Sequence, residues 1–314
     1  MLLIKSDVVR FDGLPAALAC LPDACFGIDK VQTLGLWRQW HQQGSLQIGR
    51  IYSVLPDGTI QTEAMGITTW ITHEAVVALA KETQVPRTHL LYQSAAQGLH
   101  WVMQAADIRQ AHEKRALNLM ILHFWTKGDV SKPEFHPVFL QAHASFRDVH
   151  QGFGVQTLLQ EVPLVQAPFL TAAGMQIIHT SSDSASGGLA WMGITQKDAV
   201  ASPGSTLSFL FFSPERRLKL KPAVQRMLAL AISRNTDDDI ASELGCSRDY
   251  VRKLWRHAYA DMEQVGVLAP LVQQSPSISA PVRGPERRRT ALEFLRGNPH
   301  ELRPGLANTP RTDA

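Results

Sequence analysis

The sequence contains little cysteine and no long apolar segment. Cys20, Cys25 and Cys246 are its only cysteines among 314 residues. An odd count without a CxxC pair excludes a disulfide framework and is typical of a reducing compartment, so we expect a cytoplasmic protein. No segment reaches the roughly 18 uncharged apolar residues of a membrane-spanning helix, and the start MLLIKSDVVRFDG lacks a signal-peptide core. We therefore expect no membrane partner.

Charge of one sign and catalytic motifs are also scarce. The 31 basic residues exceed the 28 acidic residues by too little to indicate nucleic acid on charge alone. The sequence has no HExxH, GxSxG, P-loop or GxGxxG motif. His136, His143 and His150 are spaced by seven residues, which separates neighbours by about 10.5 Å along a helix, too far to share one metal ion. We therefore expect neither an enzyme nor a cofactor or metal site.

The first two hundred or so residues mix strand and helix patterns. Two short strands are predicted around a Pro-Asp-Gly turn in residues 47–65, and helices over 71–83, 106–127 and 136–153. A strand over 155–165, a helix over 167–175 and a strand over 175–180 follow. The elements alternate without regular βαβ spacing, so we expect an α+β sensor-like domain, for which a PAS- or GAF-like fold is one form, over residues 1–212.

Three helices are predicted from Leu220 to Met262. Pro222 suits the first turn of the first helix, and Thr236 with Asp239 forms a capping-box pattern for the second. Gly245 can end that helix, and Ser247 can cap the third. At about 100° per residue, the third helix has one apolar face and one basic face. The layout is that of a helix-turn-helix.

The segment from Leu220 to Met262 resembles the C-terminal DNA-binding domain of LuxR-type transcriptional regulators. The matching positions are Leu220, Pro222, Thr236, Ile240, Ala241, Leu244, Gly245, Ser247, Val251 and Arg252. The resemblance implies an all-α domain over residues 213–268 that reads the major groove with the helix Arg248–Tyr259. It further implies base contacts from Arg252, Lys253 and Arg256, and phosphate contacts from Thr236, Ser247 and Arg248.

These observations predict a transcriptional regulator that binds double-stranded DNA as a homodimer, since two recognition helices multiply specificity. Its N-terminal domain would receive an unknown small-molecule or protein effector. The alternative is a protein-interaction module whose degenerate helix-turn-helix does not bind specific DNA. Residues 269–314, rich in proline, serine and arginine, are predicted to form a disordered tail. Within it, Arg287–Arg289 is interpreted as a solvated charge run, with contact to phosphate or another acidic surface as the alternative.

Overall fold

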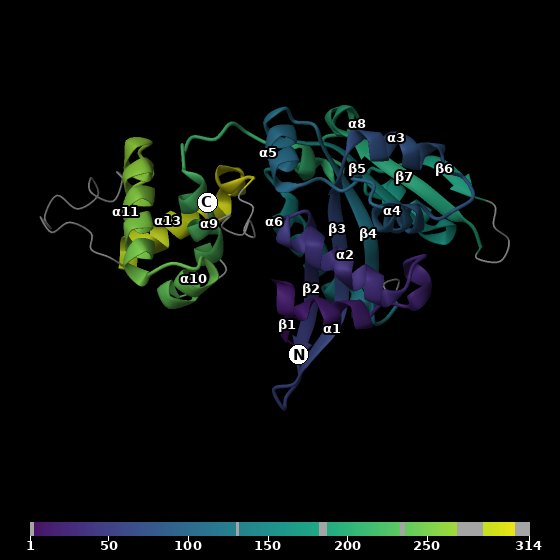
Figure 1. The fold of residues 1–314 in the computed structure, drawn as a ribbon, viewed down its shortest axis with the longest axis horizontal. Coiled ribbons are helices and arrows are strands. Elements are labelled where there is room, and N and C mark those ends of the chain that lie inside the picture. Colours follow the sequence, from purple (N-terminus) through teal and green to yellow (C-terminus); the bar gives the residue numbers. More distant parts are fainter. Residues whose placement is uncertain (1–2, 130–131, 182–186, 233–235, 269–284, 305–314) are drawn as a thin grey trace, which may run out of the picture. The chain divides into compact units, whose positions relative to one another are not determined.

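A computed structural model describes residues 3–129, 132–181, 187–232, 236–268 and 285–304 (Figure 1). The chain divides into two compact units, one formed by Met1–Phe212 and the other by Ser213–Ala307. We call them the sheet unit and the helical unit. Within the described residues, no helix is both long enough and apolar enough to cross a membrane.

The sheet unit is built on a seven-stranded mixed sheet in the order β1-β2-β3-β4-β5-β7-β6. Neighbouring strands are antiparallel except for β4 and β5, which are parallel and lie inside the sheet. The strands are β1 Leu3–Val8, β2 Leu46–Val54, β3 Ile60–Ile71, β4 Leu117–Thr126, β5 Val155–Pro163, β6 Gln176–Ser181 and β7 Leu189–Thr195.

Helices cover both faces of this sheet (Figure 1). The larger core lies under α1 Leu14–Ala19, α2 Lys30–Gln42, α3 His73–Lys81 and α4 Arg87–Ala96. On the other face, α6 His136–His150 packs Val138 and Ala142 against Ile51 and Ala64 of β2 and β3. The remaining helices of the unit are α5 Ala105–Glu113, α7 Ala167–Ala172 and α8 Gln196–Ala201.

The helix predicted over residues 106–127 is wrong in its second half. Helix α5 ends at Glu113, Arg115 takes a positive φ of 53°, and β4 starts at Leu117. The reason is that β4 lies between two strands in a sheet covered on both faces. Such a strand is apolar throughout and lacks the alternation that identifies a half-exposed strand.

A β-bulge interrupts the pairing of β3 with β4. Ile67 is opposite His123, whereas the next residue, Thr68, is opposite Ile121, so Leu122 is the extra residue. One extra residue changes which face the following side chains point to. Consequently His123 reaches the aromatic rings under α2 and α4, and Phe124 contacts Phe139 of α6 on the other face.

The helical unit contains α9 Pro222–Ile232, α10 Asp237–Glu243, α11 Arg248–Gln264, α13 Pro285–Gly297 and the 3-10 helix η6 Pro299–Leu302. The predicted caps are confirmed: Thr236 and Asp239 form a capping box at the start of α10, and Ser247 accepts from the Tyr250 N–H at the start of α11. Val251, Leu254, Trp255 and Ala258 of α11 are buried in a core shared with α9 and α10.

The predicted disordered tail is wrong where the structure describes it. Ala291 and Leu295 of α13 and Leu302 of η6 are buried in the core of the helical unit. The carboxylate of Glu301 is fully buried and accepts from the backbone N–H groups of Arg217 and Leu218. Apolar residues spaced at helical intervals in 285–302 supply this packing, which the proline- and arginine-rich composition obscured.

The predicted fold class is therefore corrected in both parts. The sheet unit is not an α+β sensor domain of PAS or GAF type, because a seven-stranded mixed sheet with an internal parallel pair forms its centre. The second part is not an all-α LuxR-type domain followed by a disordered tail, because α13 and η6 belong to its core. The other predicted tail residues, 269–284 and 305–314, lie outside the described residues.

Candidate functional site

The parallel strands β4 and β5 separate at their carboxyl-terminal ends. Their pairing runs from Leu117 opposite Val155 to Ile121 opposite Gln160, although β4 continues to Thr126 and β5 to Pro163. The first turn of α4 lies at this divergence, where the Thr88 hydroxyl is 3.5 Å from the carbonyl oxygen of Leu122. In open α/β sheets, ligands bind beyond the carboxyl ends of parallel strands. This end of the sheet is therefore the expected place for a ligand site.

A buried ion pair joins α4 to β5 at this end. Arg87 Nη1 donates to Glu161 Oε1 at 3.0 Å, and the Arg87 backbone N–H donates to Glu161 Oε2 at 2.7 Å. The two side chains are 1% and 5% exposed. The first N–H of α4 has no partner within its own helix, so the carboxylate both satisfies it and faces the positive end of the helix dipole.

Further contacts hold the guanidinium of Arg87 in place. Its Nε lies 3.4 Å from the Leu79 carbonyl oxygen, and its Nη2 donates to the Glu82 carbonyl oxygen. Its planar group also stacks on the indole of Trp191 in β7, at 5.7 Å from the ring centroid. Arg87 is therefore fixed on three sides by groups from α3, the loop that follows α3, and β7.

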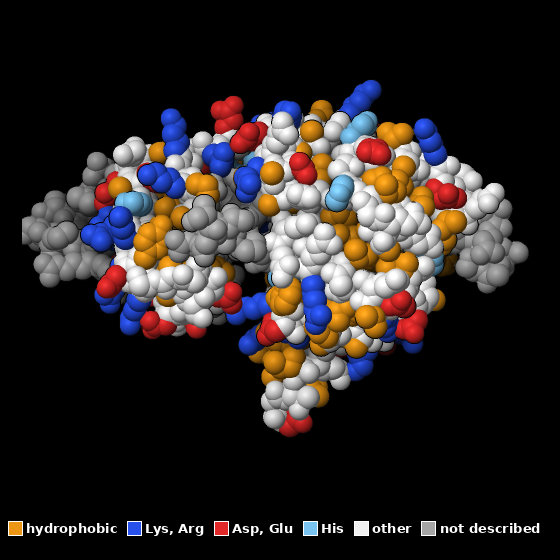
Figure 2. Space-filling model, viewed as in Figure 1, with side chains coloured by type: hydrophobic (Ala, Val, Ile, Leu, Met, Phe, Trp, Pro, Cys, Tyr) orange, Lys and Arg blue, Asp and Glu red, His pale blue; other side chains and the backbone are white. Residues whose placement is uncertain are grey.

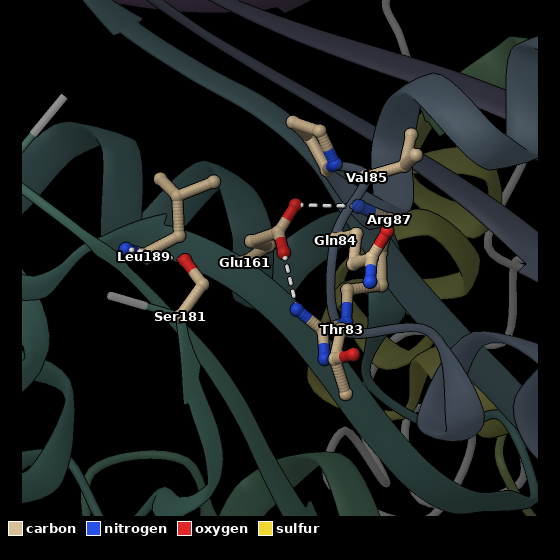
Figure 3. A pocket seen from close by; sticks show the side chains of 8 residues that line it. Thr83, Gln84, Val85, Arg87, Glu161, Ser181 and Leu189 are labelled. Atoms are coloured by element: carbon tan, nitrogen blue, oxygen red, sulfur yellow. Dashed lines mark hydrogen bonds and ion pairs between the residues drawn. The ribbon is translucent and has the colours of Figure 1, made fainter. Parts of the chain in front are cut away.

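Beside this ion pair is a cavity of about 270 Å³ (Figure 3). Its lining comes from the loop before α4, the first residue of α4, and the strands β5, β6 and β7: Thr83, Gln84, Val85, Pro86, Arg87, Glu161, Ser181 and Leu189. The Glu82 side chain organises the loop, since Oε1 accepts from the backbone N–H groups of residues 83–85. These hydrogen bonds, led by that of Gln84, lower the pKa of Glu82.

A second polar network lies deeper along α4. Trp37 Nε1 donates to the Tyr92 hydroxyl at 2.9 Å, and that hydroxyl lies 3.1 Å from His123 Nε2. Indole N–H can only donate, so the Tyr92 proton points to His123, whose Nε2 must accept. Burial lowers the pKa of His123 to about 3, with a smaller contribution from His89, and burial raises the pKa of Tyr92. The network thus keeps a neutral imidazole and a protonated phenol, and it anchors α4 to the sheet.

The residues predicted to contact DNA lie elsewhere, in the helical unit. Thr236 and Ser247 use their hydroxyls as helix caps. Arg248 lies 3.5 Å from Asp238, and Arg252 lies 2.9 Å from Asp249. Lys253 and Arg256 are exposed on the same helix. Figure 2 shows Lys and Arg side chains on this unit interspersed with acidic ones.

The predicted solvated charge run is wrong for Arg287 and Arg288, whereas Arg289 is 67% exposed. Arg287 donates to Glu263 and stacks on Tyr259, and Arg288 lies 2.9 Å from Asp237 and stacks on Trp255. These arginines hold α13 against α11. Among the described residues, no group of three or more His, Cys, Asp or Glu side chains is arranged to hold a metal ion.

Sequence reasoning did not single out Arg87 or Glu161. They are separated by 74 residues, so no local pattern connects them. One signal was present: Glu161 is the one charged residue in the β5 segment VQTLLQEVP. A single acid in an otherwise uncharged strand is rarely buried without a partner, so it indicates a paired or functional carboxylate.

Comparisons with known proteins complete the description of the site. No protein-family model and no curated protein sequence matches the chain. One similar solved structure is a chimera of the spermidine N-acetyltransferase SpeG from Vibrio cholerae and hSSAT. It is 8% identical, covers 63% of this chain and 98% of its own, and has a TM-score of 0.34. Another is the aminoglycoside acetyltransferase AAC(6')-Ib in complex with coenzyme A, 10% identical over 64% of this chain and 99% of its own, with a TM-score of 0.31.

The same aminoglycoside acetyltransferase with coenzyme A and kanamycin gives 8% identity over 64% of this chain and 99% of that chain, with a TM-score of 0.29. The identification as a LuxR-type regulator is corrected, because no family model and no curated regulator matches the chain and α13 and η6 complete the core of the helical unit. Four further predictions are corrected with it: the DNA-reading function, the interaction-module alternative, the homodimer on double-stranded DNA with its effector, and the exclusion of enzymatic activity. Likeness at these TM-scores assigns no activity, substrate or cofactor to this chain.

Proposed function

We propose that the sheet unit binds a small molecule in the cavity beside the carboxyl-terminal end of β5, between the loop that precedes α4 and the strands β6 and β7. Its position supports this, because open sheets hold ligands beyond the carboxyl ends of their parallel strands. Polar groups that could orient a ligand make up most of the lining, and Val85, Pro86 and Leu189 add apolar contacts.

The observation that carries the proposal is the burial of the Arg87–Glu161 ion pair in the wall of an open cavity. Removing two ions from water costs several kcal/mol per ion before their attraction offsets it, and a well-packed apolar pair often stabilises a fold equally well. Charged groups that are buried beside a cavity are therefore more typical of a site than of a purely structural contact.

The test is a titration of the isotope-labelled full chain with a set of small polar fragments, followed by amide NMR shifts. Coenzyme A is titrated as a separate probe. We expect saturable shifts at Gln84, Arg87 and Ser181 with at least one probe. A substitution that fills the cavity, Ser181→Trp, should abolish these shifts.

Gln156→Trp is the matched control, because Gln156 is exposed at the opposite end of β5 and does not line the cavity. This variant should bind as the unaltered chain does. Shifts confined to residues away from the cavity, or shifts that Ser181→Trp leaves unchanged, would rule out this site.

We also propose that the chain works in the reducing cytoplasm. Cys20, Cys25 and Cys246 are free thiols in support of this, and burial raises the pKa of Cys25, which favours the unreactive protonated form. Alkylation in intact cells should modify the cysteines without prior reduction. A requirement for a reductant would contradict this location.

A further inference from the structure

We infer that the imidazole of His123 binds the carbonyl oxygen of an uncharged ligand through its Nδ1–H group. This site is separate from the cavity beside Arg87 and Glu161, since His123 does not line that cavity. The inference therefore goes beyond the proposed function and does not depend on it. The place of His123 in β4, the hydrogen bonds behind its ring and the exposure of Nδ1 support it.

His123 lies where β4 no longer has its parallel neighbour. The pairing of β4 with β5 ends at Ile121, and His123 is two residues further along β4. On its other side β4 is still paired, with His123 opposite Ile67 of β3. The imidazole contacts the rings of Phe26 and Tyr92 on the face of the larger core. It thus lies beyond the carboxyl end of the paired parallel strands, where open sheets hold ligands.

The hydrogen bonds behind the ring determine where its proton lies. Trp37 Nε1 donates to the Tyr92 hydroxyl, so that hydroxyl donates its own proton to His123 Nε2. A neutral imidazole whose Nε2 accepts carries its proton on Nδ1. Burial lowers the pKa of His123 to about 3, so the ring is neutral near pH 7. His123 is therefore a neutral donor at Nδ1.

Nδ1 is the atom at which this buried chain of hydrogen bonds reaches the surface. Trp37 and Tyr92 are fully buried, whereas His123 is half-buried. Nδ1 has no partner among the described residues. Within the same residues, the side-chain nitrogen and oxygen atoms that are both buried and unpaired belong to Thr69, His143, Ser205 and Gln225. Because Nδ1 is unpaired and is not one of these atoms, it is exposed to solvent and open to a ligand.

The surroundings of Nδ1 favour an uncharged acceptor with an apolar body. Burial and the neighbouring His89 both lower the pKa of His123, so the ring offers no positive charge to offset the desolvation of a carboxylate. Trp125 lies two residues further along β4 on the same face, is half-buried and packs against the same core. Its indole can cover the apolar part of a ligand. A ketone, ester or amide oxygen on an apolar body fits both features.

The donor is also held in place before a ligand arrives. The imidazole stacks on the Tyr92 ring at a centroid distance of 5.9 Å and an interplanar angle of 11°. The Phe26 ring meets it edge-on at 5.3 Å. A group that is already fixed loses little conformational entropy on binding, so one hydrogen bond can contribute measurably to affinity.

The first measurement is the position of the ring proton. The full chain is labelled with nitrogen-15, and the ring-nitrogen NMR shifts of His123 are recorded near pH 7 and assigned by their loss in His123→Gln. We expect Nδ1 to carry the proton and Nε2 to be an unprotonated acceptor, because Tyr92 donates to Nε2.

The second measurement compares two probes of nearly the same shape, cyclopentanone and methylenecyclopentane. The second has a CH₂ group where the ketone has its oxygen. We expect cyclopentanone to shift the His123 Nδ1 resonance saturably and to bind about fivefold more tightly, which is the effect of about one neutral hydrogen bond.

His123→Phe keeps a planar ring but has no N–H, so the preference for cyclopentanone should disappear in this variant. His73→Phe is the matched control, because His73 is an exposed histidine at the start of α3 and the preference should persist there. If His123→Phe does not fold, the proton position and the two affinities of the unaltered chain still decide the inference.

Several outcomes would overturn the inference. These are a proton on Nε2 in place of Nδ1, equal affinities for the two probes, no saturable change at His123 with cyclopentanone, or a preference that persists in His123→Phe. None of them affects the cavity beside Arg87 and Glu161, whose occupancy is measured separately by the fragment titration and the Ser181→Trp variant.

Discussion

The two units of the chain place their arginine ion pairs in different environments. In the sheet unit, Arg87 and Glu161 are almost completely buried. In the helical unit, Arg288 and Asp237 are about a quarter exposed, at 31% and 20%, and Arg252 and Asp249 are mostly exposed, at 59% and 86%. Water screens the exposed pairs and can replace either partner, whereas nothing replaces a lost partner in the interior. An arginine–carboxylate pair should therefore differ greatly in its effect on stability between the two environments.

The largest effect is expected at the buried pair. Glu161→Ala leaves the Arg87 guanidinium buried without its counter-ion, so we expect the free energy of unfolding to fall by about 3–5 kcal/mol. Urea denaturation followed by circular dichroism measures it. The double variant Arg87→Met with Glu161→Leu is the control, because it removes both charges and should lose much less. Equal losses in the single and double variants would contradict a role for the unpaired charge.

A smaller effect is expected at Glu301 in the helical unit. Glu301→Ala leaves the N–H groups of Arg217 and Leu218 without their acceptor, so we expect a loss of about 3 kcal/mol in the stability of this unit. The fluorescence of Trp255, which lies in the core of this unit, reports its unfolding. Glu301→Gln keeps one oxygen acceptor and should lose less. If the two variants unfold alike, the backbone contacts are not what the carboxylate contributes.

The pH dependence of the sheet unit should carry a contribution from His123. Its pKa is about 3 in the folded chain against an ordinary value of 6.5, so between these values the unfolded chain binds the extra proton. Stability is therefore fully present above about pH 6.5 and decreases as the pH falls toward 3, by up to about 1.4 kcal/mol per pH unit. His123→Gln, which still accepts from Tyr92 but does not titrate, should flatten this slope. An unchanged slope in the variant would assign it to other groups.

The smallest effect is expected at the exposed pair. Arg252→Ala removes a contact that solvent screens, so we expect the stability of the helical unit to change by less than about 0.5 kcal/mol. Thermal denaturation at low and high salt checks this. A loss comparable with that of Glu161→Ala would remove the distinction between the two environments.

The sequence predicted local structure better than long-range structure. Three local predictions are confirmed: the strands around the Pro-Asp-Gly turn, the helix α7 with the strand β6 that follows it, and the caps at Thr236 and Ser247. Each depends on residues only a few positions apart. Strand β4 was predicted as a helix, and β7 was missed. Both are buried on two sides, so their apolar patterns carry no alternation.

The candidate site depended on contacts that sequence spacing does not reveal. Arg87 belongs to a helix between β3 and β4, and Glu161 lies on β5, so only the folded sheet brings them together. The helix-turn-helix pattern is the reverse case, in which local structure was predicted correctly but function was not. It predicted three helices and their buried face, yet a local pattern of 43 residues did not establish what the protein does.

The extra residue at Leu122 separates chain length from side-chain orientation in β4. Deleting that residue would leave Ile67 opposite position 123 and Thr68 opposite position 121, so His123 would keep its place beside Tyr92 and the core would lose only the Leu122 side chain. A one-residue deletion at this point can thus be absorbed by the bulge without exchanging the faces of the side chains that follow. Related chains that differ by one residue here should be aligned by the face each side chain occupies.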